Sequence, residues 1–230
     1  MPQRLDSPAK RAMINISLRY QPLSYSWLPA GVKIMDSAIS IRYLSVQDYH
    51  QMAEVGILLP DERVELLDGQ IITMAAKGTA HSAAVSRIEA LLRQQLGNQV
   101  LLRLQDPIRL DNYSEPEPDL AVVQPNPSYY EDHHPSPVEI FWLIEVADHT
   151  LKYDCGKKAL AYARSTIADY WVLDVNARKL HVYRNPSQTG YASETVLSDT
   201  LTVTPLAFPD CSLAIKDMLR SLPDPCDSVN

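Results

Sequence analysis

The chain has 230 residues, of which 46% are hydrophobic and 21% are charged. A chain of this length and composition is expected to form one globular domain with its own core and additional segments at its ends. Its longest apolar runs are far too short to span a bilayer, and its first residues lack the apolar stretch of a secretory signal. We therefore expect no membrane association.

Charge is distributed unevenly along the chain. The net charge is −7 at pH 7, but residues 1–42 carry +4, because six Lys and Arg residues there stand against two acidic residues. Residues 43–230 therefore carry −11. Such an acidic domain is poorly suited to holding nucleic acid by general attraction, which depends on Lys and Arg near the phosphates. It does suit a site that collects metal cations.

The three cysteines, Cys155, Cys211 and Cys226, are odd in number and widely spaced, and no CxxC motif is present. This pattern argues against a disulfide framework and against a cysteine-based zinc site. It favours a reducing compartment, so we expect a cytoplasmic protein.

Both ends of the chain differ from its middle. Residues 1–38 show no sustained hydrophobic period and contain four prolines, so we expect a weakly ordered N-terminal extension. An over-called start codon or a regulatory arm would also explain this segment. Residues 39–222 are expected to form the folded domain, and the polar residues 223–230 a frayed tail.

Local signals predict two helices in the first half of the domain. Ser45 is a good N-cap, which predicts a helix over about 46–54. A second helix begins at a cap formed by Thr79 or Ser82 and stops at Gly97. Its apolar residues recur at helical spacing and form one stripe, which we expect to face the core.

Asp68-Gly69 lies between two β-prone runs, at 64–67 and 70–74, and therefore predicts a β-hairpin. Further along, short apolar runs alternate with a helical segment at about 154–165 and a short one around 215–219. These segments predict a mixed α/β domain in which helices flank a sheet. Strands are expected at about 100–105, 107–110, 119–123, 140–147, 170–175 and 179–184, with one or two edge strands after 191.

Two acidic residues stand where neighbouring strands are expected to meet. Glu145 interrupts the almost continuously apolar strand 140–147, and Asp119 opens the strand before it. If these sequential strands pair antiparallel, the two carboxylates converge on one edge of the sheet, where they need a cation between them. Hard oxygen ligands favour Mg²⁺ or Mn²⁺. The structural alternative is a salt bridge from Glu145 to a nearby Arg or Lys.

A third acid and a lysine are further candidates. Glu65 lies among apolar residues in the first strand of the hairpin, where on its own it would be a solvated residue on the alternate face. Asp154 can cap the helix after strand 140–147, and Lys158 lies four residues later on the same face. Tyr162 lies one turn beyond. This helix start would direct Lys158 at the acids, and a surface lysine is the alternative.

The order of these residues, an early Glu, a Pro-Asp pair, a Glu and a nearby Lys, resembles the PD-(D/E)XK nuclease superfamily. Within that superfamily the chain is similar to the Uma-two family of restriction endonucleases, over about residues 43–220. Any single piece is short, but the ordered series is specific. The series consists of 63–71, His81, 105–110, 115–122, 145–148, 154–163 and 169–174.

The resemblance implies a restriction-endonuclease-like fold, in which a mixed β-sheet is flanked by α-helices. It also implies a metal-dependent endonuclease that hydrolyses DNA with Mg²⁺ or Mn²⁺ as cofactor. Asp119 and Glu145 would hold the metal, with the Val146 carbonyl as a further ligand. Glu65 matches the family's early acid and would complete the site, and Lys158 matches the family's catalytic lysine.

One position departs from the general superfamily pattern. Ala147 stands two residues after Glu145, where the usual motif has its lysine, so the lysine must come from the following helix. Lys152 and Lys157 are rivals of Lys158 that spacing does not separate. If none of the three reaches the acids, the chain is a catalytically degraded nuclease fold that binds nucleic acid or protein.

The remaining features bear on partners. His81 matches a family position at a helix start, where a structural role, a cap or a DNA contact would each be consistent. The symmetry of a duplex suggests a homodimer with two sites, and an RNase or a structure-specific nuclease would use the same residues. The candidate basic contacts to DNA are Arg87, Arg93, Arg103, Arg109, Lys152 and Lys157.

Overall fold

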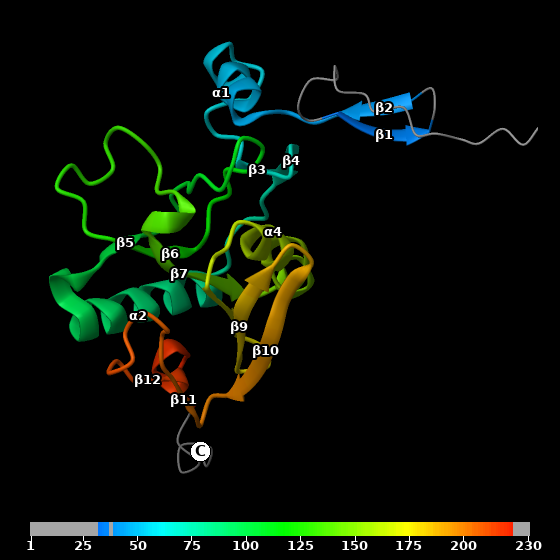
Figure 1. The fold of residues 1–230 in the computed structure, drawn as a ribbon. Helices are drawn as coiled ribbons and strands as arrows, with labels where there is room; N and C mark the ends of the chain where they lie inside the picture. Colours follow the sequence, from blue (N-terminus) through cyan, green and yellow to red (C-terminus); the bar gives the residue numbers. More distant parts are fainter. Residues whose placement is uncertain (1–31, 37–38, 223–230) are drawn as a thin grey trace, which may run out of the picture. The chain divides into compact units, whose positions relative to one another are not determined.

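The computed structural model describes residues 32–36 and 39–222 (Figure 1). Strands β1 (Val32–Asp36) and β2 (Ile39–Arg42) pair antiparallel. Strand β1 thus falls within the segment predicted as an extension, whose other residues lie outside the described part of the chain. The predicted tail, residues 223–230, also lies outside it.

Helix α1 (Val46–Glu54) has the predicted range and begins with a capping box. The Asp48 N–H donates to the Ser45 hydroxyl at 3.1 Å, and the Ser45 N–H donates to the Asp48 carboxylate at 2.9 Å. Two backbone amides that would otherwise be unpaired at the helix start are thereby satisfied.

Strands β3 (Val64–Leu67) and β4 (Gln70–Thr73) form the predicted hairpin. Its two turn residues, Asp68 and Gly69, have φ values of 49° and 70°, and positive φ at both positions is what a type I′ turn requires. Glycine is also required by space, because a Cβ at position 69 would lie 2.5 Å from the Tyr43 Cβ.

Helix α2 (Thr79–Leu96) ends as predicted where Gly97 adopts a φ of 52°. Its start was predicted wrongly, because the N-cap is Gly78 and not Thr79 or Ser82. The backbone is still extended at Gly78, and its carbonyl accepts from the Ser82 N–H at 3.1 Å to close the first turn. Four residues of the predicted apolar stripe, Val85, Ile88, Leu92 and Leu96, are buried together with Ala84, and the fifth, Leu91, is partly buried against the same core.

Six strands form one mixed sheet in the order β10-β9-β8-β7-β6-β5, with helices on its faces (Figure 1), so the predicted α/β fold class is confirmed. Every neighbouring pair is antiparallel except β7 and β8, which run parallel. A parallel pair needs a crossover connection, and a helical segment supplies it. The strands are β5 (Leu101–Arg103), β6 (Leu120–Val123), β7 (Ile140–Ala147), β8 (Asp169–Asp174), β9 (Lys179–Ser187) and β10 (Gly190–Ser198).

The crossover is a continuous helical run of three pieces: α3 (Leu151–Tyr153), a π-helical turn (Asp154–Lys158) and α4 (Ala159–Arg164). It starts earlier than predicted, so Asp154 lies inside the run and the predicted cap at this residue is wrong. Instead, the Thr150 hydroxyl donates to the Asp154 carboxylate at 2.5 Å. Single π turns inside helices are frequent at functional sites, and this one carries Lys158.

The predicted strand at 107–110 is wrong, because these residues lie in the loop between β5 and β6. Pro107, Pro116 and Pro118 have no backbone N–H to donate to a sheet, which disfavours strands here. Ile108 and Leu110 are nevertheless buried, so the apolar pattern of this segment indicates a buried loop and not a strand.

The described part of the chain closes with β11 (Thr202–Val203), β12 (Leu213–Ala214) and a 3₁₀ turn (Ile215–Met218), where a short helix was predicted. Two further 3₁₀ turns are Gly97–Gln99 and Pro137–Glu139. Among the described residues, none of the helices has the length and apolar character needed to cross a membrane.

Side chains along β7 alternate between two faces of the sheet. Every second residue from Trp142 to Val146 packs with α2 in one core cluster. Leu143 and Ala147 pack with α4 in a second cluster. Glu145 lies between these two in the alternation, so its side chain points to the face that α4 covers.

Asp169 is completely buried, and its carboxylate forms hydrogen bonds that link β8 to neighbouring parts of the chain. One carboxylate oxygen accepts from the Trp171 indole at 2.8 Å and from the Arg184 guanidinium at 3.0 Å. The other accepts from the Leu206 N–H at 2.8 Å. Trp171 packs against Trp142, with ring centroids 5.8 Å apart, so both tryptophans lie in the core.

Removal of the Asp169 carboxylate would leave the Arg184 charge and two N–H donors without their acceptor. We expect Asp169→Ala to lower the free energy of unfolding by about 3–5 kcal/mol, the range for removing one partner of a buried charge pair. Urea unfolding followed by tryptophan fluorescence measures this change. Asp61→Ala, at an exposed position, is the control and should stay within about 0.5 kcal/mol. Similar losses in the two variants would contradict the structural role of Asp169.

Candidate active site

The antiparallel pairing of β6 and β7 brings Asp119 and Glu145 together, as the sequence predicted. Leu120 lies opposite Ile144, so the residues just beyond this pair face each other. The Asp119 N–H donates to the Glu145 carboxylate at 3.2 Å, and the Val146 N–H donates to the Asp119 carboxylate at 2.9 Å. Each carboxylate is thereby anchored to the backbone of the other strand.

Glu65 and Lys158 join these acids from other elements. Glu65 is only 1% exposed, so the expectation of a solvated residue is wrong; every residue of β3 is buried, because both faces of this short strand are covered. The Lys158 ammonium lies 2.8 Å from the Glu145 carboxylate and 3.3 Å from the Glu65 carboxylate. One buried cation therefore bridges two buried acids.

Of the three lysines that spacing left open, Lys158 is the one that reaches the acids. Lys152 and Lys157 are exposed, whereas Lys158 is 5% exposed and sits at the end of the π turn. The salt bridge considered as the structural alternative for Glu145 is present as well. The structural and the nuclease-like interpretations thus use the same contact.

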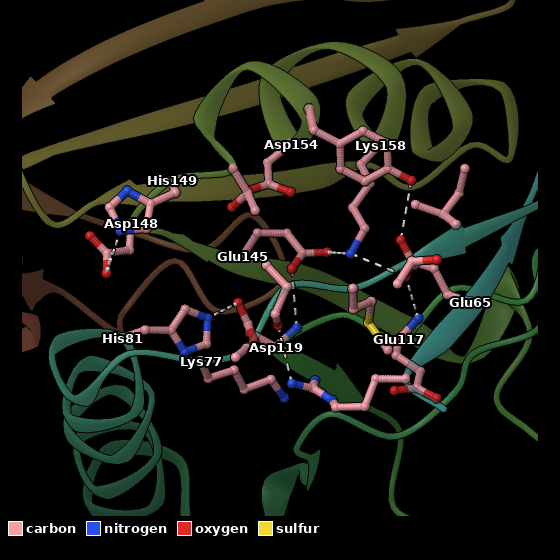
Figure 2. Close-up of a pocket in the computed structure, with 18 of the residues that line it drawn as sticks. Glu65, Lys77, His81, Glu117, Asp119, Glu145, Asp148, His149, Asp154 and Lys158 are labelled. Carbon is pink, nitrogen blue, oxygen red and sulfur yellow. Dashed lines mark hydrogen bonds and ion pairs between the residues drawn. The ribbon is translucent and has the colours of Figure 1, made fainter. Parts of the chain in front are cut away.

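These side chains line one pocket of about 290 Å³ (Figure 2). Figure 2 shows Glu145 and Asp119 in the middle of the view, with Lys158 and Lys77 approaching from opposite sides. A polyanion can approach such a pocket only if cations offset its many carboxylates. The acidic lining residues are Glu65, Glu117, Asp119, Glu145, Asp148 and Asp154.

Burial and neighbouring charges shift the ionisation of the central pair. Burial raises the pKa of Glu145 to about 8, against the opposing charge of Lys158 and with a further rise from Asp119. Burial alone would lower the pKa of Lys158, but the Glu145 and Glu65 carboxylates hold this pKa well above its usual range. Three buried acids, Glu65, Asp119 and Glu145, thus surround one lysine, and a second cation beside them would favour the ionised form of Glu145.

Two contacts of Asp119 were not predicted. The His81 Nε2 atom lies 2.9 Å from the Asp119 carboxylate, and the Gln105 side-chain amide donates to it at 3.2 Å. Burial opposes the ionisation of Asp119, but the hydrogen bonds from His81 and Val146 hold its pKa below the usual range. Both new contacts fall in the motif series quoted above, which is the signal that could have identified them.

Two tyrosines hold the glutamates. The Tyr162 hydroxyl donates to Glu145 at 2.9 Å, and the Tyr153 hydroxyl donates to Glu65 at 3.2 Å. Tyr162 lies one turn after Lys158, where spacing predicted it, whereas Tyr153 was not predicted. Burial raises the pKa of both phenols, so both remain protonated and act as donors.

The donor set suits a hydrated hard cation better than a closed zinc site. Within the described residues, no three His, Cys, Asp or Glu side chains have the arrangement of a metal site. Asp119 Oδ1 and Glu145 Oε2 each accept one hydrogen bond from the described residues, so each keeps a lone pair. Mg²⁺ is commonly bound through one or two carboxylates and keeps several waters, so this pair fits it.

A mixed sheet flanked by helices, with Asp, Glu and Lys gathered beside one strand pair, defines a nuclease-like α/β fold. A solved structure, described as a "putative nuclease belonging to DUF820" from Anabaena variabilis ATCC 29413, has this fold. It matches with a TM-score of 0.57 and 19% sequence identity, over 76% of this chain and 97% of that chain.

The profile of the Uma2 family, described as "Putative restriction endonuclease", matches residues 46–216. The chain therefore belongs to this family, and the resemblance to the Uma-two family is confirmed. A comparison with curated proteins found no match.

Removing the Lys158 charge would leave Glu145 and Glu65 facing each other without a cation. We expect Lys158→Met to lower the free energy of unfolding by about 3–5 kcal/mol in EDTA, as for other buried pairs that lose one partner. Urea unfolding measures the change. Lys157→Met removes the same charge from the neighbouring exposed residue and should change stability by less than about 0.5 kcal/mol. A larger loss of stability in Lys157→Met than in Lys158→Met would contradict the assignment of Lys158 as the buried lysine of the site.

Proposed function

We propose that the protein is a divalent-metal-dependent endonuclease that hydrolyses DNA. The observation that carries this proposal is the arrangement of Asp119, Glu145 and Lys158, in which two anchored carboxylates lie beside a lysine 2.8 Å from one of them. Membership of the Uma2 family and the nuclease-like fold support a nuclease. The proposed metal dependence and the proposed DNA substrate are inferred from the chemistry of the pocket.

Asp119 and Glu145 would hold Mg²⁺ or Mn²⁺, with the Val146 carbonyl as a further ligand. A divalent cation bound there lowers the pKa of a water molecule and polarises the scissile phosphate. Lys158 keeps a fixed positive charge beside the reacting group, where negative charge develops. Glu65 holds Lys158 in place from the side opposite Glu145 and offers a second carboxylate to orient the attacking water.

His81 and Tyr162 act as positioning residues in this scheme. His81 fixes the orientation of the Asp119 carboxylate, and Tyr162 fixes that of Glu145. Held in this way, the two acids need little rearrangement on binding a cation, and preorganised charges of this kind contribute most to catalysis.

A binding module on the same fold is the second candidate. The observation that favours it is that the Lys158 charge is shared between two carboxylates, which leaves it less available to a phosphate. The acidic balance of residues 43–230 points the same way. A cytoplasmic location and a homodimer remain predictions from the cysteine pattern and from duplex symmetry.

We expect the protein to cleave nucleic acid with Mg²⁺ or Mn²⁺ and not with EDTA. The measurement is incubation with supercoiled plasmid, linear duplex DNA, single-stranded DNA and RNA, each with either metal or EDTA. Asp119→Asn and Glu145→Gln, which keep the side-chain shape, should abolish cleavage. Lys158→Met should slow it by about 10²–10³, the usual loss when one group that stabilises developing charge is removed.

Asp61→Asn, which makes the same chemical change at an exposed position, is the matched control and should cleave like the unchanged protein. Cleavage that persists in both Asp119→Asn and Glu145→Gln would rule out the proposed site. No cleavage by a folded, unchanged protein would favour the binding module. Cleavage of RNA but not of DNA would support the proposed site and show that the substrate is RNA.

A further inference from the structure

Two cations on the rim of the active-site pocket form no ion pair with any acidic residue that the structure describes. Arg63 and Lys77 line the pocket together with Asp119 and Glu145. In the part of the chain that the structure describes, neither cation lies within ion-pair distance of a carboxylate. The one hydrogen bond found for them there runs from the Arg63 guanidinium to the Ala75 carbonyl at 3.3 Å.

The absence of an ion pair distinguishes Arg63 from most arginines that the structure describes. Lys77 shares it with Lys152, Lys157, Lys179 and Lys216, but these four are exposed, whereas Lys77 is partly buried in the pocket lining. The third cation of the pocket, Lys158, is bound to two carboxylates. Elsewhere, the arginines mostly pair with acids across the described surface. These pairs involve Arg42, Arg93, Arg103, Arg109, Arg164, Arg178 and Arg184.

Arg63 and Lys77 keep positive charge that an anionic ligand can use. Both side chains are partly buried, and burial together with the nearby Arg63 charge lowers the pKa of Lys77, against the attraction of Asp119, Glu117 and Glu145. The pocket acids therefore attract the two cations at longer range, without a direct ion pair to a described carboxylate. The charged groups of both side chains remain available to the oxygens of an anionic ligand.

The composition of the same pocket indicates that the anionic ligand is a nucleic acid. Its carboxylates repel a polyanion, so the positive charge that attracts a nucleic acid must lie beside the acids and not on a distant face. Lys77 approaches Asp119 from the side opposite Lys158 (Figure 2). A guanidinium offers paired donors to phosphate oxygens, and a lysine adds a point charge.

We propose that Arg63 and Lys77 form a binding site for a backbone phosphate of the nucleic-acid strand, next to the phosphate that is cut. This inference rests on the proposed function of the same pocket and extends it to the substrate. Glu117 and Asp148 also line the pocket and oppose the anion, so the two cations must act together.

The basic contacts suggested by the sequence lie outside the active-site pocket and stay predictions. None of those six residues lines the active-site pocket, and three of them are paired with acids. The sequence could not single out Arg63 and Lys77, because one precedes a strand and the other precedes a helix. They meet only when the β3–β4 hairpin and the start of α2 come together at the acids.

The test is binding of a fluorescein-labelled 12-nucleotide single-stranded DNA, followed by anisotropy in EDTA over a series of KCl concentrations. The variant Arg63→Gln/Lys77→Gln removes both charges. We expect it to bind at least about tenfold more weakly at low salt, since hydrogen bonds to charged groups contribute this much each. The slope of log K against log[KCl] should fall by about 0.7 for each lost phosphate contact.

The matched control is Arg220→Gln/Lys179→Gln, which removes one exposed arginine and one exposed lysine outside the pocket. It should keep the affinity and the salt slope of the unchanged protein. Equal losses in the two double variants, or no binding by the unchanged protein at the lowest salt, would overturn the phosphate site. Thermal unfolding of each variant shows whether it is folded.

DNA binding in EDTA is measured without cleavage, so this test distinguishes the phosphate site from the proposed nuclease activity. Binding that depends on Arg63 and Lys77 in a protein that never cleaves would support the phosphate site and contradict the nuclease. In a protein that cleaves, Arg63→Gln/Lys77→Gln should raise KM more than it lowers kcat. An unchanged KM would overturn the phosphate site and leave the nuclease standing.

Discussion

The site depends on two buried carboxylates, Asp119 and Glu145, each hydrogen-bonded to the backbone of the other's strand. Like charges at this depth are stable only when cations compensate them. Lys158 supplies one cation from the π turn, and Glu65 adds another acid from the hairpin, so the site still carries an excess of negative charge. A divalent cation would correct this excess, and the same charge balance explains why Arg63 and Lys77 stand at the rim.

The topology of the sheet explains how a lysine that is distant in sequence reaches this pair. The parallel β7–β8 pair requires a crossover, and the crossover helices cover the face to which Glu145 points. Ala147, two residues after Glu145, packs in one cluster with Ala159 and Ala161 of α4. These small side chains let the crossover lie close to β7, and the turn before α4 then carries Lys158 to Glu145.

Much of the fold could be predicted because its signals are local. The capping box of α1, the Asp68-Gly69 turn and the Gly97 stop each act within a few residues, and the antiparallel β6–β7 pairing followed from chain order. Other features depend on tertiary packing. The loop residue Ile108 has the pattern of a strand because it is buried, and Glu65 is covered by elements far away in the sequence. The contact between His81 and Asp119 links a helix start to a strand end, and no spacing rule encodes it.

Asp119 and Glu145 are expected to form a cation site and not only a structural ion-pair network. Calorimetric titration of the metal-free protein with Mn²⁺ tests this most directly, beside Asp119→Asn and the exposed control Asp61→Asn. We expect one site with affinity in the micromolar range, kept in the control and lost in Asp119→Asn. No binding by the folded, unchanged protein, or equal binding by Asp119→Asn, would contradict it.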